Sequence, residues 1–334
     1  MRLDSRVFTI CSVLILQPVL FGCDGGGFDA GPPPLSDGTI VYRESIDDGV
    51  ENIFVSPTPT ANEQRINIGA IFVPTSYELG PSVDLRSPSQ FSSIVTARWS
   101  PDGAKIALDV IHLSIHFSQL IVLDRDGSNA KLASPQLFMT FTPTWSPDGS
   151  QLFYTMAKGP GGTGIGLFVS NLDTDTATEI TLPFQTPANG FQSVQWSSDM
   201  QRLYFTTFDR ATEESVVYQY DRSSSLVTTL VPVVMGRIQS LSVGGKFALQ
   251  EKVNSATGIN QLVRTDLLTF EEILIEQSTD RYLGHFLGDE NAILVRRRRP
   301  FTAATQSIAR IAGNAVSLTP LLDTGDDFLD FTEH

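Results

Sequence analysis

The sequence predicts an all-β protein, a six-bladed β-propeller of four-stranded blades. The first observation is a repeated pentapeptide, WSPDG, at Trp99–Gly103 and again at Trp145–Gly149. The second is a related segment, Trp196-Ser-Ser-Asp-Met, which follows at a similar distance. The third is composition: Val, Ile, Phe, Thr, Ser and Gly are plentiful, and runs rich in Ala, Glu, Leu and Lys are scarce. Residues of the first group favour strands, so we expect β structure throughout the folded part.

More divergent copies of the same unit extend the repeat in both directions. Leu241 and Phe286 each begin a copy about 45 residues after the preceding one, and Phe331 falls at the next interval. Leu35 begins a shortened copy, which an insertion at 66–91 separates from the next. A second β-type run follows each copy in fixed phase, at 52–56, 119–124, 166–173, 216–221, 261–266 and 307–311. Two periodic signals with one spacing indicate internal repeats.

The residues of one unit predict its local structure. The tryptophan ends a first strand, and Ser-Pro-Asp-Gly forms a tight turn in which proline fixes φ and glycine accepts a positive φ. Asp102, Asp148 and Asp199 recur in the turn, where we expect their side chains to accept hydrogen bonds from turn N–H groups. Four short strands cannot bury both faces of their sheet alone, whereas radially stacked blades cover one another. The tryptophans should therefore pack between blades; the alternative is a stacking platform for a ligand.

The WSPDG repeat and the Asp-x-Asp-Gly turn at 124–127 resemble those of the six-bladed TolB-like β-propeller family. The resemblance covers residues 35–334. The sequence lacks the α/β domain that precedes the propeller in TolB, so the resemblance does not imply the whole of TolB's role. It also lacks room for the α/β-hydrolase domain that follows the propeller in related peptidases.

The two ends of the propeller are predicted to join. Residues 31–34, Gly-Pro-Pro-Pro, precede the first copy and are unsuited to an innermost strand, because proline cannot donate ladder hydrogen bonds. The run 328–332 lies in the phase of a first strand. We therefore expect it to pair with 39–42, so that the C-terminal strand completes the first blade and closes the ring.

Residues 1–22 are interpreted as a lipoprotein signal peptide. Arg2 and Arg6 form a short basic start, and 7–20 is mostly apolar. That run is too short to cross a bilayer, which takes about 20 residues, and it suits the apolar core of a secretory signal. The alternatives are an ordinary signal peptide or an apolar start without a targeting role.

The stretch Leu20-Phe21-Gly22-Cys23 resembles the lipobox of bacterial lipoproteins, although Phe21 is bulkier than is usual there. Cys11 lies within the predicted signal, so Cys23 would be the single cysteine of the mature chain. A lone thiol in an oxidising compartment is unusual unless it is modified. We therefore predict lipid attachment at Cys23, followed by a Gly- and Pro-rich tether over 23–34.

These features predict a monomeric protein of the bacterial cell envelope, held to a membrane by its lipid, with the propeller facing the periplasm or the cell surface. Asp24 resembles an inner-membrane retention signal of enteric bacteria, a rule that does not hold in all bacteria, so the sequence leaves inner and outer membrane open. The net charge of −14 argues against a nucleic-acid partner, because phosphate binding needs a basic face.

The motifs searched for do not assign catalytic, cofactor-binding or metal-binding residues. Gly-x-Ser-x-Gly does not occur, and the glycine-rich run 159–166 lacks the Gly-Lys-Ser/Thr of a phosphate loop. On one continuous strand His112 and His116 would lie about 13 Å apart, too far to share a metal ion, unless the chain bends near Ser114. His285 and His334 have no evident partners in the sequence.

The longest and most varied segments fall where second strands join third strands, which places them on one rim. They are 43–50, 156–166, 208–214, 252–258 and 296–304. Binding residues concentrate on loops held by a rigid scaffold, so this rim is the predicted binding face. It carries four consecutive arginines, Arg296, Arg297, Arg298 and Arg299. Either they pair with surface carboxylates, or they bind phosphate, a carboxylate-rich peptide or an envelope glycan.

The function most consistent with these features is a non-catalytic binding or scaffold module for an envelope protein or a peptidoglycan-associated partner. Enzyme activity is left open: the second interpretation is a metal-dependent hydrolase or lactonase with its site in the central channel. Such a site needs carboxylates, amides or histidines from several blades, and a single sequence does not identify them. The third interpretation is a purely architectural surface protein.

Overall fold

The computed structural model describes a set of segments that all lie in the unit Pro32–His334. They are 38–45, 51–56, 64–66, 72–73, 83–84, 93–112, 117–134, 140–157, 165–184, 191–254, 256–287, 289–298, 305–320 and 327–333. The predicted signal peptide, the tether with Cys23, and Leu35, Ser114, His116, Arg299 and His334 lie outside these residues.

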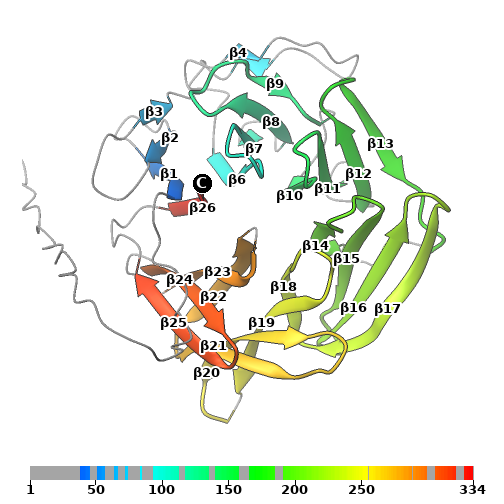
Figure 1. The fold of residues 1–334 in the computed structure, drawn as a ribbon, viewed down its shortest axis with the longest axis vertical. Helices are drawn as coiled ribbons and strands as arrows, with labels where there is room; N and C mark the ends of the chain where they lie inside the picture. The colour runs from blue at the N-terminus through cyan, green and yellow to red at the C-terminus, as the bar shows by residue number, and fades with distance from the viewer. Residues whose placement is uncertain are drawn as a thin grey trace, which may run out of the picture. The chain divides into compact units, whose positions relative to one another are not determined.

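The described chain is all β, as predicted, and forms four-stranded antiparallel blades (Figure 1). Five blades each use four strands that are consecutive in the sequence. The first two contain β6 (Ser93–Trp99), β7 (Lys105–His112), β8 (Phe117–Asp124) and β9 (Lys131–Leu132), then β10 (Thr140–Trp145), β11 (Gln151–Ala157), β12 (Ile165–Asn171) and β13 (Thr176–Ile180). The next contains β14 (Phe191–Trp196), β15 (Arg202–Asp209), β16 (Glu214–Asp221) and β17 (Leu226–Met235). The last two contain β18 (Arg237–Leu241), β19 (Phe247–Asn254), β20 (Ile259–Asp266) and β21 (Glu272–Ser278), then β22 (Arg281–Leu287), β23 (Asp289–Arg298), β24 (Thr305–Ala312) and β25 (Ala315–Pro320).

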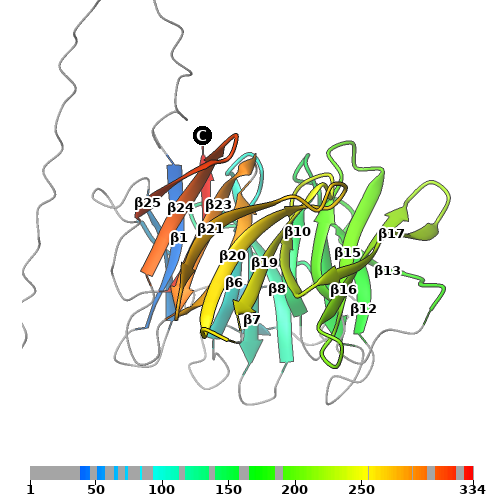
Figure 2. The same cartoon turned by 90° about the horizontal axis from the view of Figure 1, so that it is seen from below.

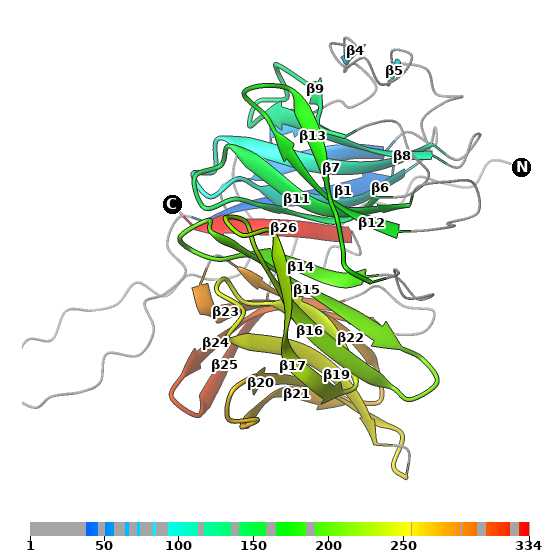
Figure 3. The same ribbon diagram turned by 90° about the vertical axis from the view of Figure 1, so that its right-hand side faces the viewer.

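Another four-stranded sheet combines both ends of the chain. Its strand order is β26-β1-β2-β3, from β26 (Asp327–Glu333), β1 (Gly38–Ser45), β2 (Glu51–Ser56) and β3 (Gln64–Ile66). The register between β1 and β26 pairs Ile40 with Phe331 and Val41 with Asp330, and it shifts between Val41 and Tyr42. The pairing of 328–332 with 39–42 that the repeat phase predicts is therefore present, and Figure 3 shows the two strands side by side. The insertion after β3 contains a short hairpin of β4 (Phe72–Val73) and β5 (Val83–Asp84).

The sheets are arranged around a common centre, with the first strand of each blade toward the middle (Figure 1). Innermost strands of successive blades are neighbours, as β10 is of β14 and β14 of β18, and β26 lies beside β6. The strands run between two rims (Figure 2). Because the pairing is antiparallel, the turns after first and third strands share one rim, here called the turn rim. The connections after second and fourth strands share the opposite rim, here called the loop rim.

The motif tryptophans pack between blades, as predicted. Trp145 is buried among Ala107 and Leu120 of the preceding blade and Leu152 of its own. Its indole Nε1–H donates to the Arg98 carbonyl of the preceding innermost strand at 2.9 Å. Trp196 repeats this arrangement by donating to the Thr144 carbonyl at 3.2 Å. A buried indole N–H needs an acceptor, and here the acceptor belongs to the preceding blade, so Trp145 and Trp196 each join two blades by both packing and a hydrogen bond.

The motif turn is held by a serine and an aspartate acting together. Ser146 is fully buried, donates to Asp148 Oδ1 at 2.6 Å and accepts from the Gln151 N–H at 2.9 Å. Asp148 Oδ1 also accepts from the Ser150 N–H at 3.0 Å. The predicted role of the aspartates in the turns is thus confirmed, and Asp102 and Asp199 accept corresponding backbone N–H groups at 3.1 and 3.0 Å. These bonds hold the pKa values of all three carboxyl groups below the ordinary value.

Divergent copies keep this geometry with different residues. Met200 occupies the glycine position of its turn with a φ of 60°, where the two WSPDG copies have Gly103 and Gly149. In the copy that begins at Leu241, Ser242 is buried and accepts from the Phe247 N–H at 3.0 Å. The buried serine is therefore retained where the tryptophan, proline and aspartate are lost.

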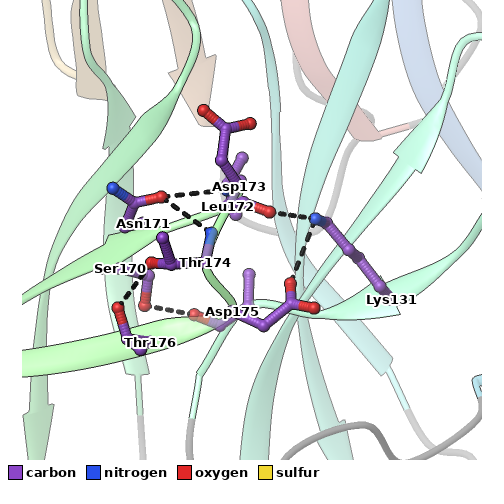
Figure 4. A network of polar contacts seen from close by, with 9 residues as sticks. Lys131, Ser170, Asn171, Leu172, Asp173, Thr174, Asp175 and Thr176 are labelled. Carbon is purple, nitrogen blue, oxygen red and sulfur yellow. Dashed lines mark hydrogen bonds and ion pairs between the residues drawn. The ribbon is translucent and has the colours of Figure 1, made fainter.

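A polar network on the turn rim adds a further link between two blades (Figure 4). Lys131 of β9 donates to the Leu172 carbonyl and forms an ion pair with Asp175 at 3.2 Å, both in the turn between β12 and β13. Asn171 Oδ1 stabilises that turn by accepting from the N–H groups of Asp173 and Thr174 at 2.9 and 3.1 Å. In this network the polar groups of the turn rim contact one another.

Candidate ligand-binding rim

The described part of the loop rim centres on the connection between β17 and β18. The Gly236 N–H donates to the Glu213 carbonyl at 2.8 Å, and Ser215 Oγ donates to the Gly236 carbonyl at 2.7 Å. Gln250 Nε2 donates to the Met235 carbonyl at 2.7 Å from a fully buried side chain. Gly236 has a φ of 92°, which side-chain-bearing residues rarely adopt. The strands β16 and β19 and the turn before β16 thus hold this connection, and they fix the backbone at Arg237, where β18 begins.

Three arginines from three successive blades lie on the loop rim; we call them the arginine cluster. Arg210 lies in the turn between β15 and β16, Arg237 begins β18 and Arg281 begins β22. Partial burial lowers the pKa of Arg237, and the charges of Arg210 and Arg281 lower it further, while Glu251 opposes them.

Glu251 is the carboxylate that balances part of this charge. Its two oxygens accept from Arg281 Nε at 2.8 Å and from the Arg281 terminal nitrogen at 2.6 Å. The Tyr282 N–H is a third donor, at 2.8 Å from Oε1. Glu251 is nearly buried, with 7% of its side chain exposed, whereas that of Arg281 is 67% exposed. The bidentate bond raises the pKa of Arg281 and holds its guanidinium at the surface.

The predicted arginine run lies along β23 and reaches the same rim. Arg297 donates through Nε to Asp280 Oδ2 at 2.5 Å, and its terminal nitrogen is 3.7 Å from Glu276 Oε1. The bond to Asp280 raises the pKa of Arg297. Arg297 is therefore paired with carboxylates of the neighbouring blade. This is what we expect if the arginine run pairs with surface carboxylates.

The other arginines of the run lie close by in the sheet. The register places Arg296 opposite Leu283 and Arg298 opposite Arg281 of the arginine cluster, and Arg299 lies outside the described residues. Binding of a ligand by Arg296, Arg297, Arg298 and Arg299 stays a prediction.

Two groups beside Arg297 have perturbed pKa values. Burial raises the pKa of Glu276 above its ordinary value of 4.5, and Arg297 partly offsets this. Burial also raises the pKa of Tyr282, whose hydroxyl donates to Ser278 Oγ at 2.8 Å. The charge of Arg297 is therefore what makes an ionised Glu276 tolerable at this position.

The described part of the chain brings no set of metal-ligand side chains together. Within it, no three His, Cys, Asp or Glu side chains gather as a metal site would require. His112 ends β7, and His285 lies in β22, four blades further along the chain. Among the same residues no helix is long and apolar enough to span a bilayer. The hydrolase interpretation thus gains no candidate residues here.

A cleft of about 340 Å³ opens between the blades of β10–β13 and β14–β17. Its lining includes Asn171, Tyr220 and Arg222. Arg222 donates to the Gln151 amide oxygen at 3.1 Å and to the Met200 carbonyl at 3.0 Å, and it lies over the Trp196 ring. The most basic group of the cleft is thus engaged in joining two blades.

Sequence analysis missed the arginine cluster. Its members are 27 and 44 positions apart, and none belongs to a charge run or a motif. One signal was present: Arg237 and Arg281 precede the divergent motif copies at Leu241 and Phe286 by nearly the same distance. A basic residue at the start of two successive first strands places two charges at the same rim.

Comparison with known proteins supports the fold. No protein-family model matches the sequence, and no curated protein sequence matches it. Among solved structures, TolB from Acinetobacter baumannii is 16% identical with a TM-score of 0.59, and the alignment covers 90% of this chain and 67% of that one. A structure from a study of two prolyl endopeptidases is 14% identical with a TM-score of 0.56, over 87% of this chain and 49% of the other.

The β-propeller domain of the Trilobed protease from Pyrococcus furiosus is 12% identical with a TM-score of 0.54, over 85% of this chain and 82% of that one. At these identities the likeness shows a TolB-like β-propeller fold and nothing finer. That domain is described as having an open velcro topology. Here, by contrast, β26 pairs with β1.

Replacing Arg297 with alanine should destabilise the fold more at neutral than at acid pH. A carboxyl whose pKa is raised in the folded state destabilises the fold once the pH rises above the pKa that the carboxyl has in the unfolded chain. For Glu276 this ordinary pKa is 4.5. Without Arg297 the pKa of Glu276 rises further, so this cost grows. We expect the free energy of unfolding to fall by about 1–3 kcal/mol at pH 7.5 and by less at pH 4. Denaturant unfolding at both pH values measures this.

A matched variant isolates the role of Glu276. Arg297→Ala/Glu276→Gln should recover part of the lost stability at pH 7.5, because glutamine carries no charge to bury. An equal loss at both pH values, with no recovery in the double variant, would show that Arg297 acts through packing alone.

Proposed function

We propose that this protein is a non-catalytic binding or scaffold module of the bacterial cell envelope, and that a protein or peptidoglycan-associated partner docks on its loop rim. The observation that carries the proposal is the difference between the two rims. On the turn rim, polar groups such as Asp148 and Lys131 are engaged within the chain. On the loop rim, charged groups such as Arg281 are fixed in place yet largely exposed. A rigid scaffold that presents exposed groups on one rim suits recognition.

The proposal includes a ring of six blades, with β26-β1-β2-β3 as the sixth. The pairing of β1 with β26 and the position of β26 beside β6 support this count, because they join the sheet β26-β1-β2-β3 to the blade of β6–β9 as a neighbouring blade would be joined. Closure would also remove two open sheet edges, which invite association with other chains.

The proposal also includes membrane attachment through lipid at Cys23, with residues 23–34 as the tether and 35–334 as the propeller. The support is the sequence Leu20-Phe21-Gly22-Cys23 and its single mature cysteine. The propeller would then face the periplasm or the cell surface. An envelope location agrees with the TolB-like fold and with the acidic composition, which argues against nucleic acid.

Mass spectrometry of the membrane-extracted protein should find a new N-terminus at Cys23 that carries acyl chains. Cys23→Ser should leave the protein uncleaved or release it from the membrane. Cleavage at another site, with a free thiol at Cys23, would contradict the lipid anchor.

Site-specific photo-crosslinking in envelope preparations tests which rim binds a partner. A photoreactive residue at Thr212, exposed on the loop rim, should give a discrete crosslinked product. The matched position is Thr174, exposed on the turn rim, where we expect no such product. Equal crosslinking at both positions, or a product at Thr174 alone, would contradict binding through the loop rim.

A further inference from the structure

The strand β17 forms the outer edge of its blade and exposes apolar side chains there (Figure 1). Its sequence, LVTTLVPVVM, contains no charged residue. The described residues include ten exposed large apolar side chains, and four of them lie on this strand: Leu226, Leu230, Val233 and Met235, which are 62, 44, 46 and 57% exposed. The sheet ends at β17, so the outward N–H and C=O groups of this strand face no further strand of the blade. Such an edge is a template for pairing with another strand.

The outer strands of the other blades have features that hinder edge-to-edge pairing. The strand β13 carries Glu179, and β21 carries Glu272 and Glu276. The strands β9 and β3 have two and three residues, and β25 has six and ends at Pro320. Charged side chains, short length and proline all protect a sheet edge, so β17 differs from the outer strands around it.

The first half of β17 is the part that can accept a partner. Its ladder with β16 is regular from Leu226 to Thr229, and the register shifts twice between Thr229 and Val234. Pro232 lies in that irregular part and has no N–H to donate. A partner strand therefore finds regular edge backbone at the start of β17.

The exposed side chains of this part are arranged symmetrically about Thr228. Leu226, Thr228 and Leu230 are exposed, whereas Val227 is partly buried and Val231 is buried. The first three residues thus present one face of the strand. An identical antiparallel strand, centred on the same threonine, would place leucine opposite leucine and threonine opposite threonine. Apolar pairs and threonine pairs directly opposite one another stabilise antiparallel sheets.

Charge favours a second copy of the chain at this edge. Two chains of net charge −14 repel one another, so they can approach closely only through an uncharged surface. The nearest carboxylate is that of Asp221, which lies opposite Leu226 in the ladder of β16. Its Oδ1 accepts from the N–H groups of Ser223 and Ser224 at 3.0 and 2.9 Å, so it is engaged in its own turn. Uncharged β17 of one copy therefore meets uncharged β17 of the other.

We propose that two copies of this chain associate by antiparallel pairing of β17 with β17, about a two-fold axis at Thr228. Leu226 of one copy then lies opposite Leu230 of the other, and Val227 lies opposite Thr229. The two blades form one continuous sheet across the dimer. The inference goes beyond the proposed function and does not rest on it, because the edge of β17 lies between the two rims and the pairing leaves the rims accessible.

The size of the contact predicts a weak dimer. A standard stable interface takes about 20–30 residues from each side, and β17 has ten residues. We therefore expect a reversible dimer with a dissociation constant of roughly 1–100 μM. At lower concentrations the protein is the monomer that the sequence predicts.

Sedimentation equilibrium of the full chain tests this inference through charge reversal on the axis. Thr228 meets itself in the proposed dimer, so Thr228→Lys and Thr228→Glu each place two like charges opposite one another. Each variant alone should dimerise about tenfold more weakly than the parent protein, because like charges directly opposite destabilise a strand pair. An equimolar mixture of the two variants should recover the dimer, because lysine then lies opposite glutamate.

Thr178→Lys is the matched control, because Thr178 is an exposed threonine on β13, the outer strand of the neighbouring blade. This variant changes the net charge equally and should dimerise within about twofold of the parent protein. The inference fails if the parent stays monomeric at about 100 μM. It fails too if Thr178→Lys weakens association as much as Thr228→Lys, or if the mixture of the two Thr228 variants recovers nothing.

A pair of double variants tests the register. In Leu226→Lys/Leu230→Glu each lysine lies opposite a glutamate of the second copy, whereas Leu226→Lys/Leu230→Lys places like charges opposite one another. The first should dimerise at least about tenfold more tightly than the second, and added salt should reduce the difference. Equal association of the two double variants would contradict pairing centred on Thr228.

A photoreactive residue at Thr228 in envelope preparations identifies the occupant of the edge. We expect a crosslinked product that contains two copies of this chain. A product with a different protein, together with a purified parent that stays monomeric, would assign the edge to that protein and overturn the inference. Thermal unfolding of each variant verifies that the fold is intact, which we expect because Leu226, Thr228 and Leu230 are exposed.

Discussion

The antiparallel pairing of β26 with β1 is the contact on which the arrangement of the blades depends. It joins residues nearly three hundred positions apart, and it places β26 in one sheet with β1, β2 and β3. Closing so long a loop costs entropy that local contacts cannot offset. The pairing therefore has to be supported by the neighbouring blades, and the position of β26 beside β6 provides such support.

Between neighbouring blades the same few interactions recur. An indole N–H reaches the carbonyl of the preceding innermost strand, as Trp145 and Trp196 do, and a buried serine closes the adjoining turn. Each interaction satisfies a buried polar group that would otherwise be costly. Because these bonds lie toward the turn rim, many polar groups of that rim are engaged in holding the blades together. The loop rim presents residues such as Arg237, whose backbone is held by the bonds of the connection between β17 and β18.

The β-propeller fold could be predicted because its sequence signals are local and repeat along the chain. The turn motif and the strand after it recur at a similar spacing, and Phe331 falls at the next interval. Even Met200, with its positive φ, occupies the position that the repeat assigns to glycine. The site could not be predicted in the same way. The arginine cluster draws its residues from three blades, and the partner of Arg281 is Glu251, which the sequence does not single out. Likewise, the run at Arg297 was visible, but its partners Asp280 and Glu276 emerge only from the packing of neighbouring blades.

Native-state hydrogen exchange measures ring closure most directly. If β26 completes a closed ring, the ladder amides of Gly38–Ser45 and Asp327–Glu333 should open together, with protection close to that of the inner pair β18 and β19. The exchange of both segments should then report the same free energy of opening. Exchange of Asp327–Glu333 at the rate of an unstructured chain, while β18 and β19 stay protected, would contradict closure.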